Sequence, residues 1–145
     1  MKSILKETND YLANLAVMYV KVHNLHWNVV GPQFKAVHEY LESIYDSLAE
    51  SLDEVAEYIK MDNGVPLAKM SDYLENSTIT EIESKDYFTL KASEILLEDI
   101  KALNEQATLL RMQAEKSDKF LLVNMLDDHI KNYQKNIWFL NSSLK

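Results

Sequence analysis

The scarcity of helix-breaking residues is the feature that most limits how this chain can fold. Its 145 residues include two glycines and two prolines, which fall in two short places, Gly31-Pro32 and Gly64 to Pro66. Turns between strands usually draw on Gly and Pro, so two such places leave too few turns for an all-β or α/β chain. We therefore predict an all-α protein built from a few long helices.

Apolar residues recur at helical spacing in long segments. We predict helices from about Ser3 to Val29, Gln33 to Met61 and Thr89 to Lys116, and a fourth that ends near Ser143. The pair Ser117-Asp118 is the expected N-cap region of the fourth helix. The apolar stripes are Leu12, Leu15, Tyr19, Val22 and His26 in the first helix, Ala92, Leu96, Ile100, Leu103, Ala107 and Leu110 in the third, and Leu122, Met125, His129, Tyr133, Ile137 and Leu140 in the fourth.

The segment from Asp62 to Phe88 is too long for a tight hairpin between the second and third helices. It contains the breakers Gly64 and Pro66, and we expect a short helix from Leu67 to Glu75 within it. A four-helix bundle with one long crossover has the ferritin-like topology. No internal repeat or interdomain linker is apparent, so a single ferritin-like domain, residues 1–145, is predicted.

Charge and missing residue types exclude several classes of function. The net charge is −8 with a single arginine, which favours cations over nucleic acid. There is no Cys, which excludes disulfides, thiolate ligands and a thiol nucleophile. No apolar run approaches the roughly 18 residues of a membrane span, and Glu7, Asn9 and Asp10 interrupt any signal-peptide core. We expect a cytoplasmic protein without a membrane partner.

Two histidines and three acidic residues have the composition of a metal site. His38, Glu42, Asp53 and Glu57 share one face of the second predicted helix, because the acids lie roughly 40°, 60° and 100° from His38 at about 100° per residue. His26 lies on the apolar stripe of the first helix. Imidazole and carboxylate ligands without sulfur suit first-row ions such as Fe, Mn or Zn.

These five residues cannot bind one metal within a single chain. His38 and Asp53 are about 22 Å apart along the helix axis, whereas ligand atoms lie about 2.0–2.2 Å from a metal. The Glu-x-x-His motif of ordinary di-iron bundles is absent. The acids must then meet the histidines of a second copy, across a two-fold axis that lays two such helices antiparallel. Tyr45, Ala49 and Ala56 share the face, and small alanines allow close approach.

A helical interaction protein with structural histidines is an alternative. A single His on an apolar stripe is more often a buried, hydrogen-bonded residue than a ligand, and acidic residues on helices usually face solvent. His23 and His129 keep this structural interpretation, because neither has acids at suitable spacing on its stripe. The joint pattern of His26, His38 and the three acids favours the metal site.

The stretch from Asn24 to Ile59 resembles the signature of the Dps mini-ferritins (DNA-binding proteins from starved cells). The signature has His-Trp-Asn, then Gly-x-x-Phe, then His-Glu, then Asp-Glu-x-Ala-Glu. The resemblance continues through Gly64-Val65-Pro66, Ser71 to Leu74 and Ile137-Trp138, and so covers nearly the whole chain. The matching residues of the signature are His26, Trp27, Asn28, Gly31, Phe34, His38, Glu39, Asp53, Glu54, Ala56 and Glu57.

The resemblance implies a ferroxidase and iron-storage function. Family members form hollow shells of twelve subunits that oxidise Fe(II), commonly with hydrogen peroxide, and store the ferric mineral inside, which protects against oxidative damage. Trp27 and Trp138 match tryptophans near the family's sites, where they intercept oxidising equivalents or simply pack. The resemblance divides the catalytic metal ligands between two subunits: His26, His38 and Glu42 from one, and Asp53 and Glu57 from its mate.

Two departures from the family pattern affect its other functions. Many members compact DNA with a Lys/Arg-rich tail, so a DNA-compacting nucleoid protein is an alternative function. This chain lacks such a tail, and DNA binding is therefore not expected. The family's iron pores are often lined by aspartates at the start of the last helix. Asn124 stands where an Asp is common, which leaves Asp118 for iron entry, with Asp127 or Asp128 as substitutes.

Overall fold

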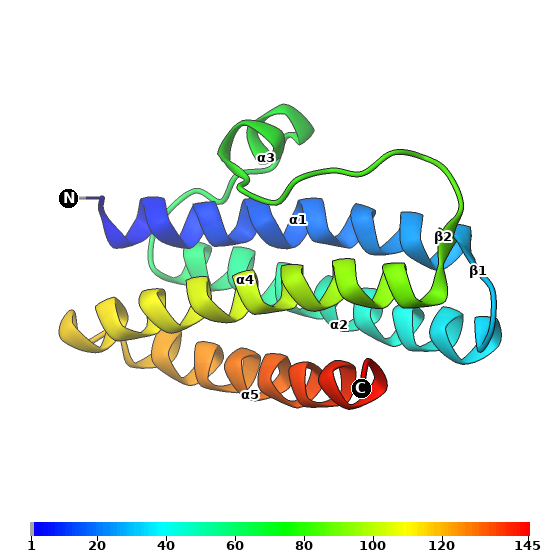
Figure 1. Cartoon of the computed structure of the whole chain (residues 1–145). Helices are drawn as coiled ribbons and strands as arrows, with labels where there is room; N and C mark the ends of the chain where they lie inside the picture. Colours follow the sequence, from blue (N-terminus) through cyan, green and yellow to red (C-terminus); the bar gives the residue numbers. More distant parts are fainter. Residues whose placement is uncertain (1) are drawn as a thin grey trace.

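Two antiparallel helix pairs form the body of the computed structural model, which describes residues 2–145. Helix α1 (Ile4–Asn28) pairs with α2 (Phe34–Met61), and α4 (Thr89–Lys116) pairs with α5 (Phe120–Ser143). A long crossover that carries α3 (Met70–Asn76) joins α2 to α4, and Figure 1 shows it passing beside α1. The predicted four-helix bundle with a crossover and a short helix is therefore confirmed.

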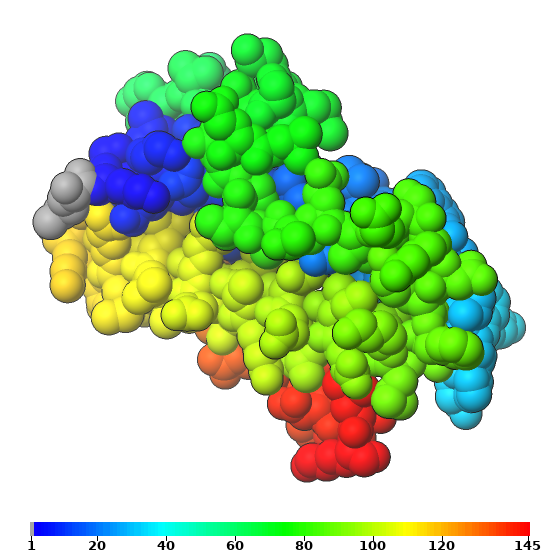
Figure 2. Space-filling model, turned by 45° about the horizontal axis from the view of Figure 1, so that its top comes forward, coloured from blue at the N-terminus to red at the C-terminus, as the bar shows by residue number. Residues whose placement is uncertain are grey.

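The short helix α3 begins at Met70 rather than at Leu67, because side chains of α1 and α3 hold the preceding residues in an extended form. The backbone N–H of Leu67 donates to Asn9 Oδ1 at 2.9 Å, and Asn9 Nδ2 donates to the carbonyl of Val65 at 3.2 Å. The Tyr73 hydroxyl donates to the Leu67 carbonyl at 2.8 Å. Figure 2 shows how closely the crossover lies on α1.

Two helices end without a glycine in the left-handed position. At the end of α2, Asn63 has φ +65°, and the Gly64 and Asn63 N–H groups donate to the carbonyls of Ile59 and Lys60. At the end of α4, Asp118 takes the same role with φ +55°. Asn and Asp tolerate this conformation better than most residues. The prediction that Ser117-Asp118 caps the next helix is wrong, because both residues close α4 and Lys119 precedes α5.

A two-residue parallel strand pair fixes the end of the crossover. Strand β1 (Val29–Val30) follows α1 and pairs with β2 (Tyr87–Phe88) just before α4. Between β1 and α2, Gly31 has φ +107°, a conformation that favours glycine, and a Cβ there would lie 3.0 Å from the Phe88 ring. The pair was not predicted, since two residues show no alternating pattern.

The core lies between the four long helices and includes one buried ion pair. Lys21 on α1 places its Nζ 2.7 Å from Asp99 Oδ2 on α4, and both side chains are largely buried. Burial raises the pKa of Asp99, and the ion pair with Lys21 opposes that effect. No helix in residues 2–145 has the length and apolarity needed to cross a membrane.

Candidate metal centre

The two histidines of the predicted site lie next to each other across the turn between α1 and α2. His26 is in the last turn of α1 and is 5% exposed, and His38 is in the second turn of α2. Their rings stack with centroids 3.7 Å apart and an interplanar angle of 14°.

Each imidazole is oriented by a hydrogen bond to the other residue's backbone. His26 Nδ1 lies 2.7 Å from the carbonyl oxygen of His38, and His38 Nδ1 lies 2.7 Å from the carbonyl oxygen of His26. A carbonyl oxygen only accepts, so both Nδ1 atoms must carry the proton. When the rings are neutral, their lone pairs are therefore on Nε2, the arrangement that a metal-binding histidine needs.

Glu42 adds a carboxylate to the histidine pair. It follows His38 by one helical turn, and its Oε1 lies 3.9 Å from His26 Nε2. The Glu42 side chain is 54% exposed, so its oxygens reach the surface of α2 beside the buried imidazole. His26, His38 and Glu42 thus supply two nitrogen donors and one carboxylate in one region.

Asp53 and Glu57 lie on the same helix but far from this group. Both are exposed on α2, and Asp53 is about 16 Å from Glu42 along the helix axis. Within residues 2–145, no group of three or more His, Cys, Asp or Glu side chains is arranged closely enough to hold a metal ion by itself. One chain therefore presents two separate groups of donors, and the assignment of all five residues to one shared site stays a prediction.

Known proteins of similar sequence and structure were found over the whole chain. A ferritin-like domain of the Ferritin family matches residues 5–145. The DNA protection during starvation protein of Helicobacter pylori is 33% identical over 132 residues, covering 91% of this chain and 92% of that protein. The chain belongs to the Dps mini-ferritin family. Its predicted ferritin-like fold is confirmed.

Solved structures of similar proteins show the same arrangement of helices. Antigen TpF1 from Treponema pallidum superposes with a TM-score of 0.96 at 31% identity, covering 98% of this chain and 91% of that one. The Dps protein from Vibrio cholerae has a TM-score of 0.93 at 27% identity, with 98% and 89% covered. The latter is described as a member of a broad superfamily of ferritin-like diiron-carboxylate proteins.

Aromatic side chains surround the histidine pair of this Dps chain. The Phe34 ring stacks on His38 with centroids 5.2 Å apart, and the Tyr45 ring meets His26 edge-on at 5.2 Å. Tyr45 also stacks on His23 at 3.8 Å, and His23 Nδ1 donates to the Tyr19 carbonyl at 2.7 Å. Sequence analysis missed these contacts. The spacing of four residues signals two of them, Phe34 with His38 and Tyr19 with His23, because such residues are neighbours on a helix.

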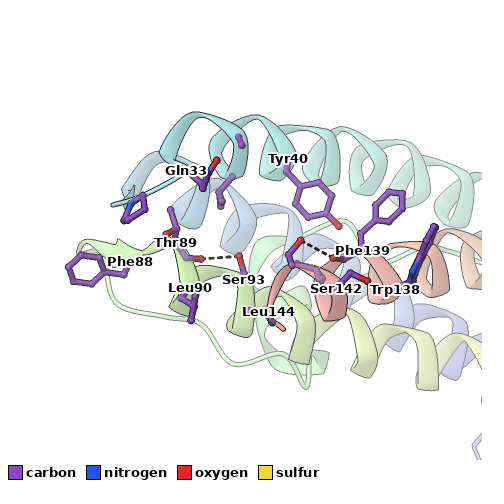
Figure 3. A pocket seen from close by; sticks show the side chains of 15 residues that line it. Gln33, Tyr40, Phe88, Thr89, Leu90, Ser93, Trp138, Phe139, Ser142 and Leu144 are labelled. Atoms are coloured by element: carbon purple, nitrogen blue, oxygen red, sulfur yellow. Dashed lines mark hydrogen bonds between the residues drawn. The ribbon is translucent and has the colours of Figure 1, made fainter.

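The two tryptophans lie in different environments. Trp27 follows His26 in α1, is 69% exposed, and has its ring 5.3 Å from that of His23. Trp138 on α5 is 64% exposed and lines an apolar pocket of about 850 Å³ between the starts of α2 and α4 and the end of α5. Figure 3 shows Tyr40, Phe88, Leu90 and Phe139 around the same pocket. None of the five predicted ligands lines it.

The acidic residues predicted for iron entry are near the start of α5. Asp118, Asp127, Asp128 and Asn124 are all exposed. Arg111 Nε donates to Asp127 Oδ1 at 2.8 Å, so Asp127 already has a cationic partner. Asp118 and Asp128 are therefore the better candidates, and the route of iron entry stays a prediction.

Proposed function

We propose that this chain is the subunit of a cytoplasmic shell of twelve copies that oxidises Fe(II) with hydrogen peroxide and stores the ferric mineral. The observation that carries the proposal is the reciprocal hydrogen bonding of His26 and His38, which directs both Nε2 lone pairs away from the backbone beside Glu42. Membership of the Dps family supports it. In this proposal Asp53 and Glu57 of a second copy complete each site.

The five proposed ligands suit the binding and oxidation of Fe(II). Two neutral imidazoles and three carboxylates match the preference of iron for nitrogen and oxygen donors, and the carboxylates offset the charge of Fe(II). Each Fe(II) gives up one electron, so two of them reduce one hydrogen peroxide with two protons to two waters. No hydroxyl radical is released, which is how consumption of iron and peroxide would limit oxidative damage.

Anaerobic titration with Fe(II), followed by hydrogen peroxide, tests the proposal. We expect ferric absorbance to rise as peroxide is added and to stop near one peroxide for each two Fe(II), the ratio set by the electron count above. Light scattering should give about twelve times the 16.8 kDa of one chain. A stable monomer that binds iron tightly would contradict the shared site, and failure of peroxide to oxidise bound iron would contradict the activity.

We also expect that the assembled protein does not bind DNA at physiological salt. Each chain carries a net charge of −8, so a shell of twelve carries about −96 and repels phosphates. A gel mobility shift without divalent cations tests this at about 150 mM salt. A shift that persists under these conditions would favour the DNA-compacting alternative.

A further inference from the structure

Four side chains from three helices form a continuous line of hydrogen bonds from the core to the surface of α2. The hydroxyl of Tyr133 on α5 contacts the hydroxyl of Tyr11 on α1, which lies 2.9 Å from Nδ1 of His129 on α5. On the other side of the ring, His129 Nε2 lies 3.2 Å from Glu54 Oε1 on α2. Tyr11, Tyr133 and His129 are buried, whereas the Glu54 side chain is 56% exposed.

Glu54, at the surface end of the line, determines which group donates in each of these hydrogen bonds. An ionised Glu54 only accepts, so His129 Nε2 carries a proton and Nδ1 of the neutral ring is an acceptor. Tyr11 then donates to His129 Nδ1, and its oxygen accepts from Tyr133. Burial raises the pKa of Tyr11 well above its usual value, so Tyr11 keeps its proton at neutral pH.

Tyr11 differs from other hydrogen-bonded tyrosines in having a basic acceptor. A phenol that loses an electron becomes a strong acid, so its oxidation requires a group that takes the proton. His129 Nδ1 can take it, and the resulting imidazolium lies beside the Glu54 carboxylate. The Tyr40 hydroxyl instead donates to the amide oxygen of Asn136 at 2.6 Å, which is far too weak a base.

We propose that Tyr11 is a one-electron donor that completes peroxide reduction when an iron site holds one Fe(II) instead of two. This rests on the proposed function. Fe(II) supplies one electron and Tyr11 supplies the other. These two electrons and two protons from solvent reduce hydrogen peroxide to two waters. The phenolic proton of Tyr11 moves to His129 Nδ1. The products are Fe(III), a neutral Tyr11 radical and an imidazolium at His129. Glu54 directly follows the predicted ligand Asp53 in α2, so the outer end of the line is one residue along the chain from that ligand.

Electron paramagnetic resonance of freeze-quenched samples tests the proposal. The assembled protein is loaded anaerobically with one Fe(II) per predicted site and mixed with hydrogen peroxide. We expect an organic radical whose spectrum narrows in protein made with ring-deuterated tyrosine, and which weakens when two Fe(II) are loaded. Tyr11→Phe should lose the signal. Tyr40→Phe is the matched control and should keep it, since it removes a hydroxyl that has no basic acceptor.

Two further variants separate the redox role from a structural one. The double variant Tyr11→Phe/Tyr133→Phe removes both hydroxyls and so avoids leaving that of Tyr133 unpaired if Tyr11→Phe alone folds poorly. His129→Gln keeps Tyr11 but offers no base, and it should also lose the radical.

Ferric absorbance of the same samples distinguishes failure of this proposal from failure of the proposed function. If ferric absorbance appears without a tyrosine radical, or if the radical persists in Tyr11→Phe, only the proposed role of Tyr11 is overturned. A radical that persists in His129→Gln overturns the proton transfer to His129. Absence of ferric absorbance in the wild type overturns both the proposed function and the role of Tyr11.

Discussion

Shells assembled from a mixture of His38→Ala and Asp53→Ala subunits should recover part of the iron oxidation that each pure variant largely lacks. Each substitution removes one predicted ligand from every site of its own shell. Loss of a residue that hydrogen-bonds to a metal ligand typically costs about 10–100-fold in metal affinity or activity. Loss of a ligand itself should therefore lower the rate of iron oxidation at least about tenfold. The measurement is the initial rate of peroxide-driven ferric absorbance.

Recovery is expected because the two substitutions lie in different halves of a shared site. Where one variant of each kind meets across a two-fold axis, one site carries both changes and the other carries neither. With equal, random mixing, half of the interfaces are of this kind, so about a quarter of the sites are intact. Shells mixed from His38→Ala and Glu42→Ala subunits are the matched control, since both changes lie in the same half and no intact site forms. Mixed His38→Ala and Asp53→Ala shells that stay inactive, with mixing verified by mass spectrometry, would exclude the shared site.

Replacing Lys21 by Met should destabilise the fold strongly. Lys21 Nζ lies 2.7 Å from Asp99 Oδ2, and the two side chains are 5% and 14% exposed. Without Lys21, the buried carboxyl loses its cation, while burial already raises the pKa of Asp99. Breaking a buried ion pair from one side typically costs about 3–5 kcal/mol of unfolding free energy. Denaturant unfolding at a fixed protein concentration measures the loss.

The double variant Lys21→Met/Asp99→Leu is the control for that prediction. It removes both charges and fills their space with apolar side chains, and such replacements are often neutral or stabilising. We therefore expect its stability to be close to that of the wild type. A double variant no more stable than Lys21→Met would show that the loss comes from packing around Lys21 and not from the unpaired carboxyl.

Spacing of apolar residues predicted the long helices well, because that pattern is local. Helix α4 has the predicted bounds Thr89–Lys116, and its stripe from Ala92 to Leu110 is buried. The end of α4 was harder to predict. Asp118 is as suitable for an N-cap as for a left-handed C-terminal position, and hydrogen bonds to the last carbonyls of α4 selected the second.

The sequence by itself determined which donors are present and that a single helix cannot bring His38 and Asp53 to one metal. That conclusion needs only the rise per residue of a helix. It could not show which ring nitrogen of His26 and His38 is available, because each tautomer depends on a carbonyl oxygen of the other helix. Nor could it show that Tyr11 meets His129, because these residues are 118 positions apart in the chain. The tertiary structure decided both points, since only packing brings such groups within hydrogen-bonding distance.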